Sequence, residues 1–257
     1  MSSSPLAVNH WSDAACARAF RSQHALPPYQ ELLGDTVAWL APRPGERWLD
    51  LGCGSGQLSK ALWQVSGGRL AEIVGLDCAA ANARSYAHLR ATLRPTPTLE
   101  SLRFVAGDFS HGLAAWPDGR FDGIVSGLAV QYAESFDAAA GRWTSAAYDR
   151  VLAEVCRLLC PGGRFVFSVN VPEPAWGRVA LRSLVESLRH RNPLRYLFKA
   201  LSMYRYGGWL KREARKGRFH YLPLPTIIDK LTAAGFTGIE HRLSFAGQAF
   251  LIRGWKP

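Results

Sequence analysis

The stretch Trp48-Leu49-Asp50-Leu51-Gly52-Cys53-Gly54-Ser55-Gly56 decides how the rest of this 257-residue chain is interpreted. Its apolar residues run into three glycines at alternate positions, and a helical pattern follows as far as Val65. Glycine readily takes positive φ and leaves no side chain between backbone and ligand. The N-terminus of the following helix offers unpaired N–H groups and the positive end of its dipole. The stretch therefore predicts a strand, a loop suited to a ligand, and a helix.

The spacing of the glycines excludes two common nucleotide-binding motifs. It is G-x-G-x-G, and Gln57 stands where a dinucleotide fingerprint needs Gly or Ala. The chain also has no G-x-x-x-x-G-K-[ST] phosphate loop, no G-x-S-x-G elbow and no zinc-site spacing of His and Cys. Taken alone, the loop also fits a tight turn that binds nothing.

Short apolar strands alternate with helices around this stretch. Strands are expected at residues 47–51, 72–76, 102–106, 121–126 and 164–169, with helices at 29–41, 55–65, 79–93 and 143–159. This alternation predicts a parallel sheet covered on both faces, which right-handed crossovers make doubly wound. A further helix is expected at 226–234. Strands at 236–245 and 248–253 follow it with only Ala246-Gly247 between them, which favours a final antiparallel hairpin.

Two acidic residues follow strands next to the glycine loop. Asp77 ends the second expected strand, where a carboxylate can accept hydrogen bonds from the hydroxyls of a ribose. Asp108 follows the third strand. Either residue alone also fits a helix cap or a turn. Because three successive strands each end in a suitable group, the pattern favours a ligand site at this edge of the sheet.

Taken together, these segments resemble the class I S-adenosylmethionine-dependent methyltransferases, those acting on small molecules among them. The resemblance covers residues 29–172 and 221–257 and rests on five segments, which are Leu49–Gly56, Val74–Asp77, Ala106–Phe109, Phe121–Ser126 and Leu158–Phe165. It implies an α/β fold with a doubly wound, seven-stranded, mostly parallel Rossmann-like sheet of order 3-2-1-4-5-7-6. It also implies S-adenosyl-L-methionine as the cofactor and in-line methyl transfer as the activity.

The resemblance further implies a set of cofactor-binding residues. Asp50 would orient the amino group of the cofactor, Asp77 would hold the ribose hydroxyls, and Asp108 would accept from the adenine amino group. Ser126 and the glycine after it would face the reacting methyl, and Cys53 would be a small structural residue of the loop. The full set expected to bind the cofactor is Asp50, Gly52, Cys53, Gly54, Gly56, Asp77, Cys78, Asp108, Phe109 and Ser126. No metal site is expected.

A dedicated catalytic base is optional for this chemistry, because positioning alone can lower a barrier by about 7–11 kcal/mol. The candidates for such a base are Tyr132, Tyr29, His220 and His24. Tyr132 is the best placed, because it follows the fourth strand closely. Each of the four also fits an ordinary packing or surface role.

The chain carries a formal charge of +11, and nearly all of it lies in one segment. Residues 174–220 hold twelve basic and two acidic residues, a net +10, interleaved with aromatic residues. We interpret the chain as one domain in which this basic, helical segment is an insertion that forms a lid. The other parts are an N-terminal helical segment (1–46), the cofactor-binding core (47–173) and a closing helix and hairpin (221–257). Asn192-Pro193 and Gly207-Gly208 are expected to divide the lid into about three helical pieces.

Three hypotheses compete for the lid, beside an ordinary solvated surface. It can form a pocket for a small acidic or amphipathic substrate, contact a membrane surface from outside, or bind nucleic acid. Nucleic acid is the less favoured partner, because Ser126-Gly127-Leu128-Ala129 stands where enzymes acting on base amines resemble one another in [DNS]-P-P-[YFW].

The sequence therefore predicts methyl transfer to an O or N acceptor on a small amphipathic, anionic or lipid-like substrate. An RNA methyltransferase and a non-catalytic cofactor-binding module are the alternatives. The five cysteines are scattered, and no signal peptide or membrane-spanning run is apparent, so a cytoplasmic location is expected.

Overall fold

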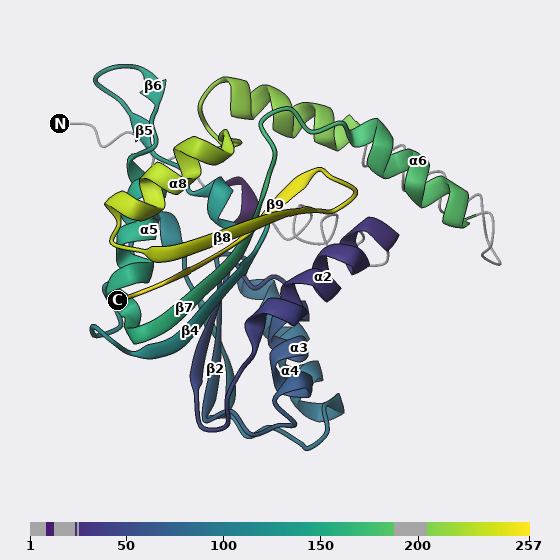
Figure 1. Ribbon diagram of the computed structural model, residues 1–257, viewed down its shortest axis with the longest axis vertical. Coiled ribbons are helices and arrows are strands. Elements are labelled where there is room, and N and C mark those ends of the chain that lie inside the picture. The colour runs from purple at the N-terminus through teal and green to yellow at the C-terminus, as the bar shows by residue number, and fades with distance from the viewer. Residues whose placement is uncertain (1–8, 13–23, 25, 188–204) are drawn as a thin grey trace.

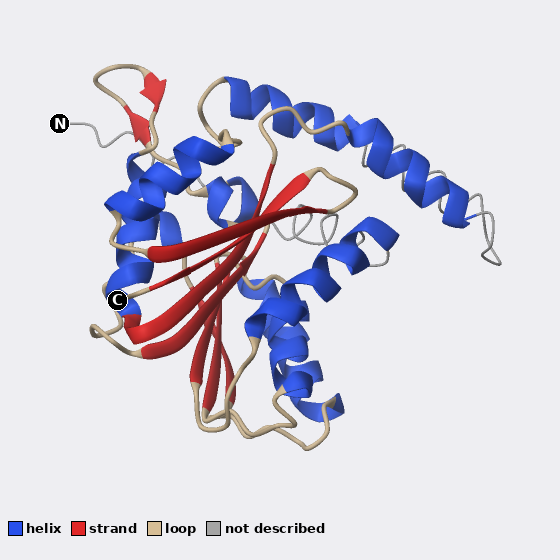
Figure 2. Cartoon of the chain, in the orientation of Figure 1, coloured by secondary structure: helices blue, strands red, loops and turns tan. Residues whose placement is uncertain are grey.

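The structure, a computed structural model, describes residues 9–12, 24, 26–187 and 205–257. A seven-stranded sheet of order β3-β2-β1-β4-β7-β9-β8 lies between two layers of helices (Figures 1 and 2). Its strands are β1 (Arg47–Leu51), β2 (Glu72–Asp77), β3 (Leu102–Ala106), β4 (Phe121–Gly127), β7 (Leu159–Asn170), β8 (Thr237–Ser244) and β9 (Ala249–Trp255). The α-helices are α2 (Pro27–Leu40), α3 (Gln57–Val65), α4 (Ala83–Thr92), α5 (Ala146–Leu158), α6 (Trp176–Ser187) and α8 (Leu224–Ala233).

The order of the strands is the predicted one. The numbering differs only because β5 (Phe136–Asp137) and β6 (Arg142–Trp143) form a separate two-stranded hairpin ahead of α5. Strands β1, β2, β3, β4 and β7 run parallel, whereas β9 is antiparallel to both β7 and β8. The fold is therefore a doubly wound Rossmann-like sheet that closes in an antiparallel hairpin.

Alternation along β1 sends its side chains into two different cores. Leu49 and Leu51 pack with residues of α5 and α8, whereas Trp48 packs with residues of α2, α3 and α4. Because successive side chains of a strand point to opposite faces, Asp50 lies on the same face as Trp48, under α3. A buried carboxylate thus stands among apolar side chains directly beneath the glycine loop.

Three local boundaries differ from the sequence prediction. Trp143 belongs to the β5–β6 hairpin, so α5 begins at Ala146 and not at residue 143. The helix expected from residue 79 opens with a 3-10 turn, η3 (Ala80–Asn82). Strand β7 begins at Leu159 and not at residue 164, because hydrogen bonds between Lys256 and the Gly162-Gly163 pair extend the strand.

The prediction that Gly207-Gly208 interrupts the lid is wrong, because residues 205–215 form a continuous helix. A Cβ at Gly207 would lie 2.6 Å from Trp176 Cδ1, so this glycine permits close packing of the helix on the start of α6. Figure 1 shows both helices beyond the carboxyl end of β7. The predicted break at Asn192-Pro193 lies outside the described residues.

Candidate functional site

The three glycines of the loop all have positive φ, but they differ in what a side chain would meet. Cβ atoms at Gly52 and Gly56 would lie 2.3 Å from Ala129 Cβ and 2.6 Å from Leu89 Cδ1, so packing requires both glycines. A Cβ at Gly54, where φ is +50°, would meet nothing within 4 Å. Gly54 also lines a cavity, so its bare backbone faces open space. The middle glycine is the one that leaves room for a ligand.

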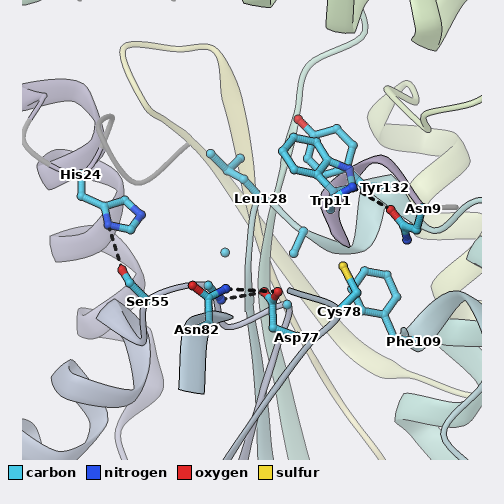
Figure 3. Close-up of a pocket in the computed structure, with 14 residues that line it drawn as sticks. Asn9, Trp11, His24, Ser55, Asp77, Cys78, Asn82, Phe109, Leu128 and Tyr132 are labelled. Carbon is cyan, nitrogen blue, oxygen red and sulfur yellow. Dashed lines mark hydrogen bonds between the residues drawn. The ribbon is translucent and has the colours of Figure 1, made fainter. Parts of the chain in front are cut away.

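The cavity lies at the carboxyl ends of β1, β2 and β4, and the space not filled by atoms there is about 650 Å³, open solvent at its mouth included. Figure 3 shows its lining, which consists of Asn9, Trp11, His24, Gly52, Gly54, Ser55, Asp77, Cys78, Asn82, Phe109, Gly127, Leu128, Ala129 and Tyr132. A second, more open cavity of about 1170 Å³ shares Asn9 and Cys78 with the first and extends toward Asp108 and the β5–β6 hairpin.

Asp77 connects the ends of β1 and β2. One carboxylate oxygen accepts from the backbone N–H of Gly54 at 2.8 Å, and the other accepts from Ala79 N–H at 2.8 Å and Asn82 Nδ2 at 3.2 Å. Burial raises the pKa of this carboxyl above its usual value. A carboxylate offers about four acceptor positions, so Asp77 retains capacity for a hydroxyl of a ligand.

Asp50 lies beneath the loop and is 1% exposed. Its Oδ2 accepts from both the backbone N–H and the hydroxyl of Ser59, at 3.0 and 2.7 Å. Its Oδ1 is buried and has no hydrogen-bond partner among the residues that the structure describes. Burial raises the pKa of Asp50 to about 7. An unpaired buried oxygen here fits a site that takes a donor group from a ligand.

Asp108 takes the capping role that the sequence left open. Its Oδ1 accepts from Ser110 N–H at 2.8 Å and so caps the 3-10 helix η4 (Phe109–His111), while Oδ2 accepts from Asn9 Nδ2 at 2.8 Å. The residue lines the second cavity, and its neighbour Phe109 lines the first. Cys78 lies between the two cavities, where burial raises the pKa of its thiol to about 12.

Four residues of the predicted cofactor-binding set line neither cavity: Asp50, which lies beneath the loop, and Ser126, Cys53 and Gly56. Ser126 is fully buried, and its hydroxyl donates to the Leu51 carbonyl at 2.7 Å, which ties β4 to β1; the next residue, Gly127, is the one that lines the cavity. Cys53 packs in the core below the loop, where burial raises the pKa of its thiol. Gly56 forms the N-cap of α3.

The candidate bases are placed unequally. Tyr132 lines the cavity, and burial raises the pKa of its phenol, whose oxygen lies 3.0 Å from Tyr221 Oη. Tyr29 does not line the cavity itself but stacks on His24, which does, with ring centroids 4.6 Å apart, and burial also raises its pKa. His220 donates from Nε2 to the Ala133 carbonyl at 2.9 Å, and burial lowers its pKa. His24 lines the cavity on the loop side, 3.3 Å from Ser55 Oγ (Figure 3).

The N-terminal segment contributes two residues to the site that no sequence pattern predicts. Asn9 binds Asp108, and Trp11 lies against Tyr132 with ring centroids 4.4 Å apart. Both belong to residues 9–12, which include the 3-10 helix η1 (His10–Ser12). No sequence motif predicts these contacts of Asn9 and Trp11, because their partners lie about a hundred residues away in the chain.

The lid packs behind the wall of the cavity that Tyr132 and Trp11 form. Leu210, Phe219 and Tyr221 form an apolar cluster with Tyr132, and Trp11 and Trp209 pack against it. An ion-pair network fixes this part of the lid, because Arg218 lies 3.1 Å from Glu134 and 3.4 Å from Glu213. The described part of the insertion therefore packs behind Tyr132 and Trp11, which line the cavity, and none of its own described residues lines it.

Comparisons with known proteins agree with this geometry. The family described as "Methyltransferase domain" matches residues 49–167. Malonyl-[acyl-carrier protein] O-methyltransferase of Serratia marcescens is 28% identical over 236 residues, covering 88% of this chain and 78% of that protein. The protein of the same name from Methylococcus capsulatus is 34% identical over 132 residues, which are 51% of this chain and 40% of that protein.

A solved structure shares the fold along nearly the whole chain. The N-methyltransferase NodS from Bradyrhizobium japonicum, in complex with S-adenosyl-L-homocysteine, has a TM-score of 0.55 at 16% identity and covers 92% of this chain and 91% of its own. In the chain described here, the bare backbone at Gly54 and the buried oxygen of Asp50 fit the amino-acid end of such a ligand, and Asp77 fits its ribose. The chain belongs to the class I S-adenosyl-L-methionine-dependent methyltransferases.

Proposed function

We propose that this methyltransferase acts on an oxygen acceptor, the carboxylate of a small amphipathic, acyl-like substrate. Bound S-adenosyl-L-methionine supplies the electrophilic methyl group and the leaving group. The protein then has to align the acceptor oxygen with that methyl group and exclude water. The described residues around the cavity suit this task, because Trp11 and Tyr132 line it and aromatic rings of the lid pack behind them.

The proposal rests on the chemistry of the aromatic wall, the cluster that Tyr132, Phe219 and Tyr221 form with Trp11 packed against it. Its polar groups include the phenol of Tyr132, which lines the cavity, and that of Tyr221 behind it; the two hydroxyls lie against each other, and burial raises both pKa values. Phenols in that state keep their protons at neutral pH and are poor bases. A carboxylate is already ionised at neutral pH and needs no base, whereas an amine arrives protonated. This wall therefore favours a carboxylate oxygen over a nitrogen acceptor.

The two curated relatives support the same choice. Their names describe O-methylation of a malonyl group that is carried on a protein, so the acceptor in those proteins is an acyl compound. At 28% and 34% identity they support the class of acceptor, and the particular acyl group and its carrier belong to the proposal.

The outer face of the lid supports an anionic surface as the place where the substrate is collected. Exposed positions along the helix 205–215 include Arg205, Arg212 and Arg215 and no acidic residue. Arg205 and Arg212 have no ion-pair partner among the described residues, whereas Arg215 pairs with Glu173. No helix in the described part of the chain has the length and apolar character needed to span a bilayer. Because of its exposed arginines, we assign this face of the helix to peripheral contact with anionic lipid.

A panel of matched acceptors tests the proposed function. Purified protein with S-adenosyl-L-methionine is offered medium-chain compounds that end in a carboxylate, a primary amide, an amine or an alcohol, and malonyl thioesters. We expect S-adenosyl-L-homocysteine to form with the carboxylates alone, together with a product heavier by one methylene and hydrolysed by base. Turnover of the amine at a comparable rate, with the carboxylates inert, would overturn the carboxylate assignment and leave the methyltransferase assignment intact.

A further inference from the structure

Beneath the glycine loop, three buried polar side chains from β1, α3 and α4 form one hydrogen-bonded chain. Ser59 Oγ lies 2.7 Å from Asp50 Oδ2 on one side and 2.7 Å from Tyr86 Oη on the other. None of the three is more than 1% exposed. Ser59 and Tyr86 come from helices whose sequence shows only an amphipathic pattern, and the roles assigned above leave both unused.

The sheet leaves space for this chain of contacts at one position. In the pairing of β1 with β2, Asp50 lies opposite Gly75. A Cβ at Gly75 would lie 2.0 Å from Tyr86 Oη, so any other residue at this position would displace the tyrosine hydroxyl. Glycine inside a strand costs stability, and it often marks a place where another group approaches closely. Here the approaching group is the hydroxyl that contacts Ser59.

When Asp50 is ionised, the hydrogen atoms available on these three side chains fix which group donates in each hydrogen bond. A carboxylate can only accept, so the Ser59 hydroxyl donates to Asp50 and accepts from Tyr86. Together with the Ser59 backbone N–H, this gives Oδ2 two donors and fixes the rotation of the carboxylate. The other oxygen, Oδ1, then stays without a partner among the described residues.

We propose that Ser59 and Tyr86 are positioning residues that hold Asp50 so that its free oxygen Oδ1 receives the ammonium group of S-adenosyl-L-methionine through one bridging water. The charges around the loop favour a positively charged ammonium group. The carboxylates of Asp50 and Asp77 lie beside the loop, and none of the described residues lining the cavity is Lys or Arg. Asp50 itself lies behind that lining, and water is the usual partner of a buried polar atom that no protein group reaches.

Two ligands that differ in one part separate this role from a general effect on the loop. S-adenosyl-L-homocysteine carries the ammonium group, and 5′-methylthioadenosine lacks the whole amino-acid end. Isothermal titration would give the Kd of both ligands for the unmodified protein, Tyr86→Phe and Ser59→Ala. The matched control is Tyr148→Phe, because Tyr148 is equally buried but its hydroxyl has no partner among the described residues.

We expect Tyr86→Phe to weaken S-adenosyl-L-homocysteine binding about two- to tenfold, the effect of one lost hydrogen bond. Ser59→Ala should weaken it by about tenfold or more, because the Asp50 carboxylate loses a direct donor. Binding of 5′-methylthioadenosine should stay unchanged in both, and Tyr148→Phe should change neither ligand. Equal losses for the two ligands, or no loss in either folded variant, would overturn the proposal.

A pH profile of ligand binding gives a second readout that simple loss of packing would not move. The Ser59 hydrogen bonds favour the ionised form of Asp50, so Ser59→Ala should move the midpoint of S-adenosyl-L-homocysteine binding to higher pH. An unmoved midpoint would contradict the inference. These titrations need no methyl acceptor, so their outcome is separate from that of the acceptor panel.

Discussion

The Asp77 carboxylate accepts a hydrogen bond from the backbone N–H of Gly54 at 2.8 Å. The acid at the end of β2 therefore fixes the bend at the end of β1, so that one residue both shapes the loop and faces the cavity. Ala79 N–H and Asn82 Nδ2 hold its other oxygen from the far side. The orientation of the carboxylate is thus set before any ligand arrives, which lowers the entropic cost of ordering this side chain on binding.

Replacing Asp77 with alanine should weaken cofactor binding strongly. Hydrogen bonds to a charged group contribute about 1.5–3 kcal/mol, so a loss of about tenfold to a hundredfold in S-adenosyl-L-homocysteine affinity is expected. Isothermal titration measures it, with the exposed Asp118→Ala as the matched control. An unchanged affinity in a folded Asp77→Ala protein would remove the ribose-binding role from this residue.

The glycines of the loop should separate into two classes on substitution. Gly52→Ala and Gly56→Ala place a Cβ within 2.6 Å of a neighbouring side chain, so each should lower the melting temperature markedly. Gly54→Ala meets open space and should cost only about 1–2 kcal/mol for its positive φ. Thermal melts with and without S-adenosyl-L-homocysteine check this. Only Gly54→Ala should keep its fold while losing the stabilisation by ligand, and an undiminished ligand shift would contradict it.

The pattern of apolar residues predicted the sheet because strand and helix periods depend on local sequence. The same reasoning missed Asn9 and Trp11, whose role depends on docking a short segment onto residues far along the chain. It also misread Gly207 as a break, because glycine serves both at helix ends and at close helix contacts, and only the position of Trp176 distinguishes the two.

Within the site, the sequence pattern predicts the residues of the glycine loop but not the residues that support the loop from below. Asp50 and Asp77 stand at strand ends, which the sequence marks clearly. Ser59 and Tyr86 sit inside helical patterns, and Gly75 inside an apolar strand. Ser126 was assigned to the reacting methyl, but its hydroxyl turns inward to Leu51, a direction that strand alternation alone did not reveal.

Cofactor affinity should fall as the pH drops below 7. Burial raises the pKa of Asp50 to about 7, so in the ligand-free protein the carboxyl becomes neutral below that pH. The ammonium group of the ligand favours the ionised form, so binding has to expel a proton at lower pH and weakens by up to about tenfold per pH unit. Titrations in buffers of different ionisation enthalpy should detect proton release near pH 6. The release should vanish in Asp50→Asn, and a flat profile between pH 5.5 and 8 would contradict the prediction.

The outer face of the lid should bind anionic membranes without affecting the cofactor site. The triple substitution of Arg205, Arg212 and Arg215 by alanine removes cations from exposed positions of one helix, whereas the aromatic residues on its inner face stay in place. Each basic residue near an anionic bilayer contributes about 1 kcal/mol, so binding to phosphatidylserine-containing vesicles should fall by about a hundredfold. Sedimentation with vesicles, at low and high salt, measures it.

The matched control removes three exposed arginines elsewhere, Arg43, Arg84 and Arg142, and should retain vesicle binding. S-adenosyl-L-homocysteine affinity should be the same in both triple variants, because these side chains do not line its cavity. If the unmodified protein ignores anionic vesicles but binds single-stranded RNA with a steep dependence on salt, the lid surface serves nucleic acid instead. Loss of cofactor affinity in the lid variant would show that the lid helps to hold the cofactor and is not a separable surface.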